Sequence, residues 1–300
     1  MWLPLAFLSA LLLGAYDTCK KASLNGNAVI PVLLLNTFFC SLLLLPLILL
    51  SAFAPHTLQD TIFYVPATDL RSHLYIFLKA CLVLSSWLFA YFATKHLPIT
   101  IAAPIKASQP ILTLIGAMLI YNETLNLYQW IGVSVSIVAF ILLSISGKRE
   151  GINFKHNIWI VFILLATVTG AMSGLYDKYL LSHGFHRMTV LTWYSLYQLA
   201  LMAIITLIVW YPNRTKTTPF VWRKSIFFIS LFLVCADFVY FYALSYPHSM
   251  ISIVSMVRRS SVVVSFTAGA LFFKEKNIKN KAIDLLLVLI GMLFLYLGTR

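Results

Sequence analysis

The chain has 300 residues, of which 61% are hydrophobic and 10% are charged, and its 22 Lys and Arg outnumber its 9 Asp and Glu. Soluble domains are about 45–50% apolar and about 25% charged, so no soluble core could bury this much apolar surface. The composition predicts a multi-spanning membrane protein whose basic residues lie mostly in loops at an anionic membrane face. No basic soluble domain is left to bind nucleic acid, so we expect no such partner.

A membrane-spanning helix needs about 20 mostly apolar residues, and the chain contains ten segments of that kind. They are 2–17, 29–53, 73–94, 98–121, 127–146, 157–181, 188–211, 225–245, 248–273 and 281–298. The first segment lacks a basic start and a small-residue cleavage site, so we interpret it as a span and not as a removable signal. Because lipid offers no partners to backbone polar groups, the predicted fold is all-α with ten transmembrane helices.

An internal repeat divides the chain into two predicted five-helix halves, 1–147 and 157–300, joined by a linker at 148–156. The motif Gly-x-Tyr-Asp at 14–17 recurs at 174–177. It makes four helix-end residues equivalent between the halves: Tyr16, Asp17, Tyr176 and Asp177. Because five is odd, the second half would enter the membrane in the opposite orientation, an inverted-topology repeat with substrate near the midplane.

The same symmetry aligns the fourth and ninth segments. IKASQPILTLIGAMLIYNE (105–123) matches VRRSSVVVSFTAGALFFKE (257–275), with Lys106 over Arg258. Pro104 and Pro110 bracket Lys106, and Pro110 removes the helical hydrogen bond to the carbonyl of Lys106. A helix broken at this depth is tolerated where it lines a cavity, although a simple kink is the alternative.

Buried positive charge is the main functional signal. Arg258 and Arg259 lie near the middle of 248–273, where one charged side chain costs about 2.5–3.5 kcal/mol. Among carboxylates, only Asp237 lies clearly inside a predicted span. The arginines could pair internally, or the missing negative charge could belong to a substrate, since arginine binds phosphate and carboxylate bidentately. The candidate substrate-binding residues are Lys106, Arg258 and Arg259, and the candidate cavity or gating residues are Lys79, Pro104, Gln109, Pro110, Asp237 and Tyr240.

No pattern in the chain indicates an enzyme. The four cysteines lie in or beside apolar runs without a C-x-x-C pair, and HGFH (183–186) has no evident third metal ligand. Walker, G-x-S-x-G and triad patterns are absent from the sequence. We therefore expect no metal, no cofactor and no enzymatic activity.

Ten helices in two halves, with Glu123 and Glu275 closing the fourth and ninth segments, resemble the drug/metabolite transporter superfamily and its EamA-type members. The resemblance covers nearly the whole chain. IKASQP (105–110) is similar to the Ile-Lys-Ala-x-Glu-Pro segment of the plastid translocators, in the sugar-phosphate/nucleotide-sugar translocator branch. VRRSSVVV (257–264) is similar to their Lys-Arg-Val-Val-Val segment. The resemblance implies that the basic residues of these two segments bind phosphate. Gln109 replaces the usual glutamate and Arg258 the usual lysine.

The expected function is a secondary transporter of a small organic anion, phosphorylated compounds included, that works by alternating access. The alternatives are an exporter of neutral or zwitterionic metabolites such as amino acids, with the arginines paired internally, and a lipid-phosphate flippase subunit. The expected setting is a bacterial inner membrane, as a monomer or homodimer in the lipid bilayer with a small-molecule substrate.

The orientation of the termini is left open. The resemblance implies a cytoplasmic N-terminus, whereas the positive-inside rule argues for the opposite. With a cytoplasmic N-terminus, several predicted loops outside the cell would be rich in basic residues. The first of these loops contains Lys20 and Lys21.

Overall fold

The computed structural model describes residues 2–121, 126–128, 130–132, 134–135, 138–139, 142, 156–246, 249, 251–272 and 278–298. The regular elements in these ranges are all helices. The first half supplies α1 (Trp2–Leu24), α2 (Val29–Phe53), α3 (Leu70–His96), α4 (Ile99–Ala107) and α5 (Gln109–Tyr121). The second half supplies α7 (Ile158–Ser182), α8 (Arg187–Ile205), α9 (Ser225–Leu244), α10 (Ile251–Arg259), α11 (Ser261–Leu271) and α12 (Ile278–Leu297).

Short irregular turns extend two of these helices. A 3₁₀ turn at Pro55–Thr57 follows α2, and a π turn at Thr206–Trp210 with a 3₁₀ turn at Tyr211–Asn213 continues α8. The described residues of the predicted span 127–146 are helical, while most of the predicted linker 148–156 lies outside the described residues.

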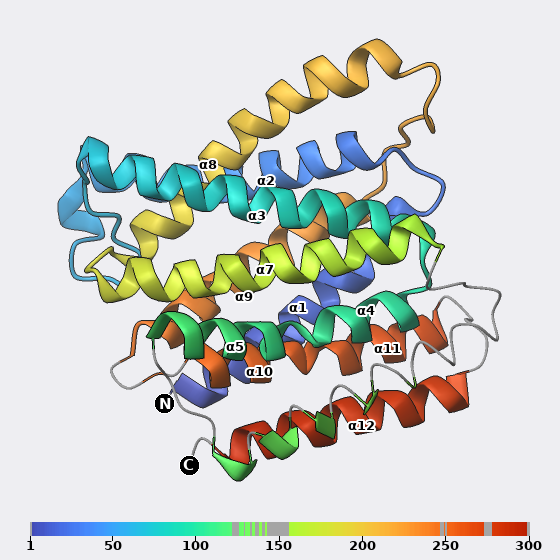
Figure 1. Ribbon diagram of the computed structural model, residues 1–300. Coiled ribbons are helices and arrows are strands. Elements are labelled where there is room, and N and C mark those ends of the chain that lie inside the picture. Colours follow the sequence, from blue (N-terminus) through green and yellow to red (C-terminus); the bar gives the residue numbers. More distant parts are fainter. Residues whose placement is uncertain are drawn as a thin grey trace.

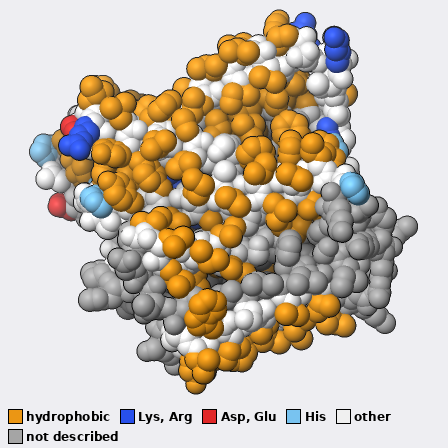
Figure 2. All heavy atoms as spheres, in the orientation of Figure 1, with side chains coloured by type: hydrophobic (Ala, Val, Ile, Leu, Met, Phe, Trp, Pro, Cys, Tyr) orange, Lys and Arg blue, Asp and Glu red, His pale blue; other side chains and the backbone are white. Residues whose placement is uncertain are grey.

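Several helices are suited to a bilayer. Five described helices are long and apolar enough to cross a membrane: Val29–Phe53, Leu70–His96, Ile158–Ser182, Arg187–Asn213 and Ser225–Leu244. Apolar side chains cover most of the described area of the face in Figure 2, with basic side chains at its edges. These features identify an integral membrane protein, and the count of ten spans stays a prediction.

The predicted fourth and ninth spans are each divided into two shorter helices. α4 ends and α5 begins around Ser108, whose backbone N–H and hydroxyl donate to the carbonyl of Ile105 at 3.1 and 2.7 Å. α10 and α11 meet around Ser260, which makes the same two bonds to Val257 at 3.0 and 2.7 Å. The two breaks lie at equivalent positions of the repeat.

The two breaks have different sequence causes. The first follows from Pro110, which has no N–H to continue the helical ladder. The second was not predicted, because no proline is present. Its local signal is the pair Ser260–Ser261, and serine side chains that bond the preceding turn are a recognised cause of kinks.

The predicted end of the first helix at residue 17 is wrong, because α1 continues to Leu24. Lys20 and Lys21 are therefore not loop residues. Lys20 is 2% exposed and forms an ion pair with Asp17, and the Lys21 ammonium donates to the carbonyls of Thr94 and Leu97 at 2.9 and 2.7 Å. These partners satisfy both ammonium groups, so the helix can run on past its apolar segment.

The two halves are packed into one bundle (Figure 1). α1 packs on α9, α2 on α8 and α3 on α7, so each pair joins a helix of the first half to one of the second. The broken helices lie side by side and run in opposite directions, with α4 against α11 and α5 against α10. Their breaks consequently meet in the interior of the bundle.

The contact of α1 with α11 can be tested at Gly14. A Cβ atom there would lie 2.4 Å from the Cβ of Val264, whereas a Cβ at Gly174, the equivalent glycine of the repeated motif, would have nothing within 4 Å. We expect Gly14→Ala to lower the free energy of unfolding by about 1–3 kcal/mol through overpacking. Gly174→Ala should cause no loss. Thermal unfolding of both variants in one detergent checks this, and equal losses would contradict the close approach.

Candidate substrate-binding cavity

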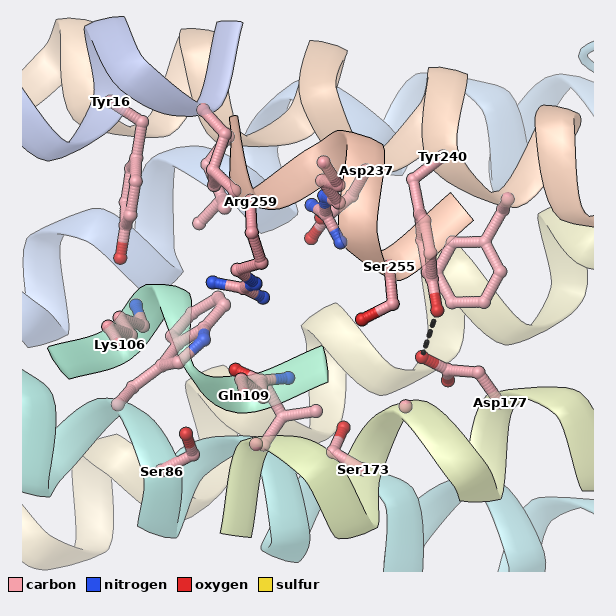
Figure 3. Close-up of a pocket in the computed structure, with 18 of the residues that line it drawn as sticks. Tyr16, Ser86, Lys106, Gln109, Ser173, Asp177, Asp237, Tyr240, Ser255 and Arg259 are labelled. Carbon is pink, nitrogen blue, oxygen red and sulfur yellow. Dashed lines mark hydrogen bonds and ion pairs between the residues drawn. The ribbon is translucent and has the colours of Figure 1, made fainter. Parts of the chain in front are cut away.

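A cavity of about 100 Å³ lies where the two helix breaks meet, and residues from both halves of the chain line it (Figure 3). Its polar and charged lining includes Tyr16, Lys79, Ser86, Lys106, Gln109, Ser173, Asp177, Tyr194, Asp237, Tyr240, Ser255, Arg258 and Arg259. The breaks therefore open a polar space inside an otherwise apolar bundle.

Lys79 is neutralised inside the bundle. Its Nζ lies 2.5 Å from Oδ1 of Asp177 and donates to the hydroxyl of Ser173 at 2.7 Å. The other oxygen of Asp177 accepts a hydrogen bond from the Tyr240 hydroxyl at 3.3 Å (Figure 3). This cluster ties α3 to α7 and α9.

Arg258 is also paired. It forms an ion pair with Asp237, whose second oxygen accepts a 2.7 Å hydrogen bond from the Tyr194 hydroxyl. The guanidinium carbon of Arg258 lies 4.3 Å from the centre of the Tyr240 ring, within the range of a cation–π contact. Arg258 is thus fixed in one position at the wall of the cavity.

A third ion pair, between Lys20 and Asp17, lies beside the cavity. The Lys20 ammonium also lies 4.4 Å from the centre of the Tyr16 ring. The sequence analysis placed one carboxylate, Asp237, clearly inside a span, and this number of buried carboxylates was too low. Asp17 is in the interior of α1, because this helix is longer than predicted, and Asp177 is buried in α7.

Lys106 and Arg259 are different, since neither makes an ion pair or hydrogen bond with any residue that the structure describes. The Nε of Arg259 is buried without an acceptor. Asp17 attracts both groups at longer range, but it is already paired with Lys20. Figure 3 shows both side chains reaching into the same space.

The lining of the cavity carries an excess of positive charge. Among the described lining residues, four cationic side chains face two carboxylates, a formal surplus of two. Unpaired cations away from water are costly, so this arrangement is suited to an anion.

Gln109 and Gly170 shape one wall of the cavity. Gln109 is 5% exposed, and a Cβ atom at Gly170 would lie 2.8 Å from its Oε1. Glycine at position 170 therefore leaves room for the Gln109 amide. Pro110 is buried beside Gln109.

The remaining residues singled out from the sequence lie elsewhere. The side chain of Pro104 lies outside the described residues, as do Glu123 and Glu275. Tyr176 does not reach the cavity: its hydroxyl donates to the carbonyl of Tyr75 at 3.3 Å and its ring stacks on Tyr179. The symmetry of the motif matched Tyr16 with Tyr176, but only Tyr16 lines the cavity.

Sequence reasoning did not select Ser173, Tyr194 or Ser255 as cavity residues. Ser173 immediately precedes the Gly-x-Tyr-Asp motif, and Ser255 lies one helical turn before Arg258 and Arg259, so both had a local signal. No local signal distinguished Tyr194 from the neighbouring aromatic residues, because its partner Asp237 belongs to a helix distant in the chain.

Comparisons with known proteins extend this description. An uncharacterised protein, MJ1333.1 of Methanocaldococcus jannaschii, is 35% identical over 80 residues, which cover 27% of this chain and 58% of that protein. The aligned region is thus little more than half of that relative's length. A crystal structure of a protein with 14% identity matches 99% of this chain and 97% of the other with a TM-score of 0.67, which shows a shared fold.

The family comparison covers both halves of the chain. Residues 1–145 and 157–297 match the model of the EamA-like transporter family. These two regions leave only the linker region and the last three residues unmatched. This match, over nearly the whole chain, shows that the protein belongs to the EamA-like transporter family.

Proposed function

We propose that the protein is a secondary transporter of a small organic anion. Lys106 and Arg259 hold this anion in the cavity between the two helix breaks, which we call the central cavity. The observation that carries this proposal is the lack of any described counter-ion for these two cations where the helix breaks meet. The surplus of two positive charges matches a doubly charged group, such as a phosphate monoester or a dicarboxylate. Arginine supplies bidentate donors and lysine a point charge for such a group.

The three predicted ligands have different roles in this proposal. Arg258 is held by its ion pair with Asp237, whose carboxylate also accepts a hydrogen bond from Tyr194. Arg258 therefore shapes the cavity wall and adds to the positive potential inside the cavity. Lys106 and Arg259 are available for direct contact with the anion. Gln109 and Ser255 line the same space and can bind its neutral part by hydrogen bonds.

Alternating access would follow from an inverted repeat of two five-helix halves. The matched breaks at Ser108 and Ser260, and the antiparallel course of the broken helices, support this relationship. Discontinuous helices at a repeat interface are the usual setting of transport sites.

Two hydrogen bonds link segments from the two halves at one end of the bundle, and an opening motion there would have to break them. The Asn27 amide donates to the carbonyl of Val221 at 2.7 Å, and Arg223 donates to the carbonyl of Ala22 at 2.6 Å. Both bonds join α1 or the loop that follows it to the segment before α9.

A second candidate is the export of neutral or zwitterionic metabolites. Two of the cations are already neutralised by carboxylates of the protein, Lys79 by Asp177 and Arg258 by Asp237. These pairs favour the second candidate, because the two charges need no anionic substrate. That candidate leaves Lys106 and Arg259 without a counter-ion among the described residues, so we prefer the anion.

Ligand-dependent thermal unfolding distinguishes the two candidates. Phosphorylated metabolites, dicarboxylates, amino acids and neutral sugars are compared at fixed ionic strength. A ligand at a hundred times its Kd should stabilise the protein by about 2.7 kcal/mol. We expect an anion to do so, and Lys106→Gln and Arg259→Gln to weaken its binding at least tenfold. Arg214→Gln, in an exposed loop, is the charge-matched control. Stabilisation by neutral or zwitterionic compounds alone would favour the second candidate.

The position of the substrate can be tested without changing any charge. Gly174 lines the cavity, and a Cβ atom there would meet nothing within 4 Å. Gly174→Leu should fill the cavity and weaken anion binding at least tenfold while the melting temperature of the unliganded protein stays near that of the wild type. Unchanged affinity in a stable Gly174→Leu protein would contradict binding in this cavity.

The structural role assigned to Arg258 predicts strong coupling to Asp237. Asp237→Asn leaves a buried guanidinium without its counter-ion and should cost about 3–5 kcal/mol of stability. The double variant Asp237→Asn/Arg258→Gln should cost less than Asp237→Asn alone. Thermal unfolding of both single variants and the double variant measures the coupling, and simple additivity would contradict the pair.

A further inference from the structure

A second cavity, of about 390 Å³, lies at one end of the bundle. We call it the end cavity. It is formed by the carboxyl ends of α7 and α9, the amino end of α8 and the segment before α10. Its polar lining residues are Lys178, Ser182, His186, Arg187, Ser245, Tyr246 and Ser249. No carboxylate belongs to the described lining, so its charged groups are all basic.

Arg187 lies over the end cavity, and no acidic residue in the described part of the chain pairs with it. Its guanidinium carbon lies 4.7 Å from the centre of the Tyr242 ring, and Nη1 donates to the Ser245 hydroxyl at 3.3 Å. Its Nε is buried and has no acceptor among the described residues. The guanidinium is therefore oriented by neutral groups and retains donors for an anion.

His186 adds a neutral polar group beside this guanidinium. Its Nδ1 is buried without a partner in the described part of the chain. Burial, and next the charge of Arg187, lower the pKa of His186, which favours the uncharged imidazole. It can donate or accept a hydrogen bond without adding charge.

The amino end of α8 adds backbone donors to the same place. This helix has 19 residues, begins at Arg187, and has no side-chain cap at His186. The first N–H groups of an uncapped helix lack intrahelical partners, and the positive end of the helix dipole favours an anion. His186 and Arg187, at the start of this helix, both line the end cavity.

The end cavity lies along the same helices as the central cavity. α7 contributes Asp177 to the central cavity and Leu181 to the end cavity. α9 contributes Phe241 to the central cavity and Ser245 to the end cavity. Four residues of helix correspond to about 6 Å. The Tyr240–Asp177 hydrogen bond lies at this end of the central cavity (Figure 3).

We propose that the end cavity is a second anion-binding site, which takes a phosphate-type oxyanion on Arg187 and the amino end of α8. The phosphate can belong to a lipid headgroup at the membrane surface or to a soluble anion about to enter the central cavity. The proposal does not depend on what the central cavity transports.

Calorimetric titration with inorganic phosphate, in a maltoside detergent that carries no phosphate, tests the site. We expect a binding event that Arg187→Gln weakens at least tenfold and that persists in Lys106→Gln/Arg259→Gln. Arg214→Gln is the matched control, since Arg214 also lies over a tyrosine ring, with its guanidinium carbon 4.5 Å from the centre of the Tyr211 ring. If the central cavity also binds phosphate, the titration should show a second binding event. Lys106→Gln/Arg259→Gln should remove that second event, and Arg187→Gln should leave it unchanged.

Ser245→Asp gives a second test that keeps the arginine. Ser245 is exposed, so the change should not disturb folding, and the new carboxylate would occupy Arg187. We expect the same loss of phosphate binding as in Arg187→Gln.

Phosphatidylglycerol distinguishes the two sources of phosphate. If a lipid headgroup occupies the site, this lipid should compete with inorganic phosphate and be retained in native mass spectra, both in an Arg187-dependent way. If a soluble anion occupies it, phosphate binding should be unchanged by the lipid. The proposal is overturned if neither phosphate nor phosphatidylglycerol binding changes in Arg187→Gln and Ser245→Asp.

Discussion

The cost of removing charge from water is the constraint on which this structure depends. In the part of the chain that the structure describes, five cationic side chains and three carboxylates lie in or beside the centre of the bundle. Two of the ion pairs connect different helices, Lys79 of α3 with Asp177 of α7 and Arg258 of α10 with Asp237 of α9. If the two helices of such a pair separated, each buried charge would lose its counter-ion. These pairs therefore also favour one particular packing of the helices.

The helix breaks explain how a charged space can exist inside an apolar bundle. Each break is a single serine whose hydroxyl and N–H both bond the carbonyl three residues earlier, so the backbone changes course without leaving that carbonyl unpaired. Lys106 lies two residues before the first break, and Arg259 lies immediately before the second. Two distant parts of the chain thereby deliver their cations to one place.

Much of this arrangement was predictable from the sequence. Apolar run length gave most helix positions, and the repeat aligned Lys106 with Arg258 and predicted that the two segments are related. Local patterns could not show how charges are divided. Whether Arg258 or Arg259 pairs with Asp237 depends on the direction of neighbouring side chains about 100° apart on one helix. The end of α1 was missed for a similar reason, because the partners of Lys20 and Lys21 become visible only after folding.

The Lys79–Asp177 pair has a consequence for the synthesis of the protein. Lys79 belongs to the first half of the chain and Asp177 to the second, so α3 leaves the ribosome well before its counter-ion exists. On insertion scales a central lysine costs about 2.5–3.5 kcal/mol, which the long apolar remainder of α3 must offset during that interval. The final position of α3 is therefore fixed only when α7 arrives, and assembly of the first half is completed by the second.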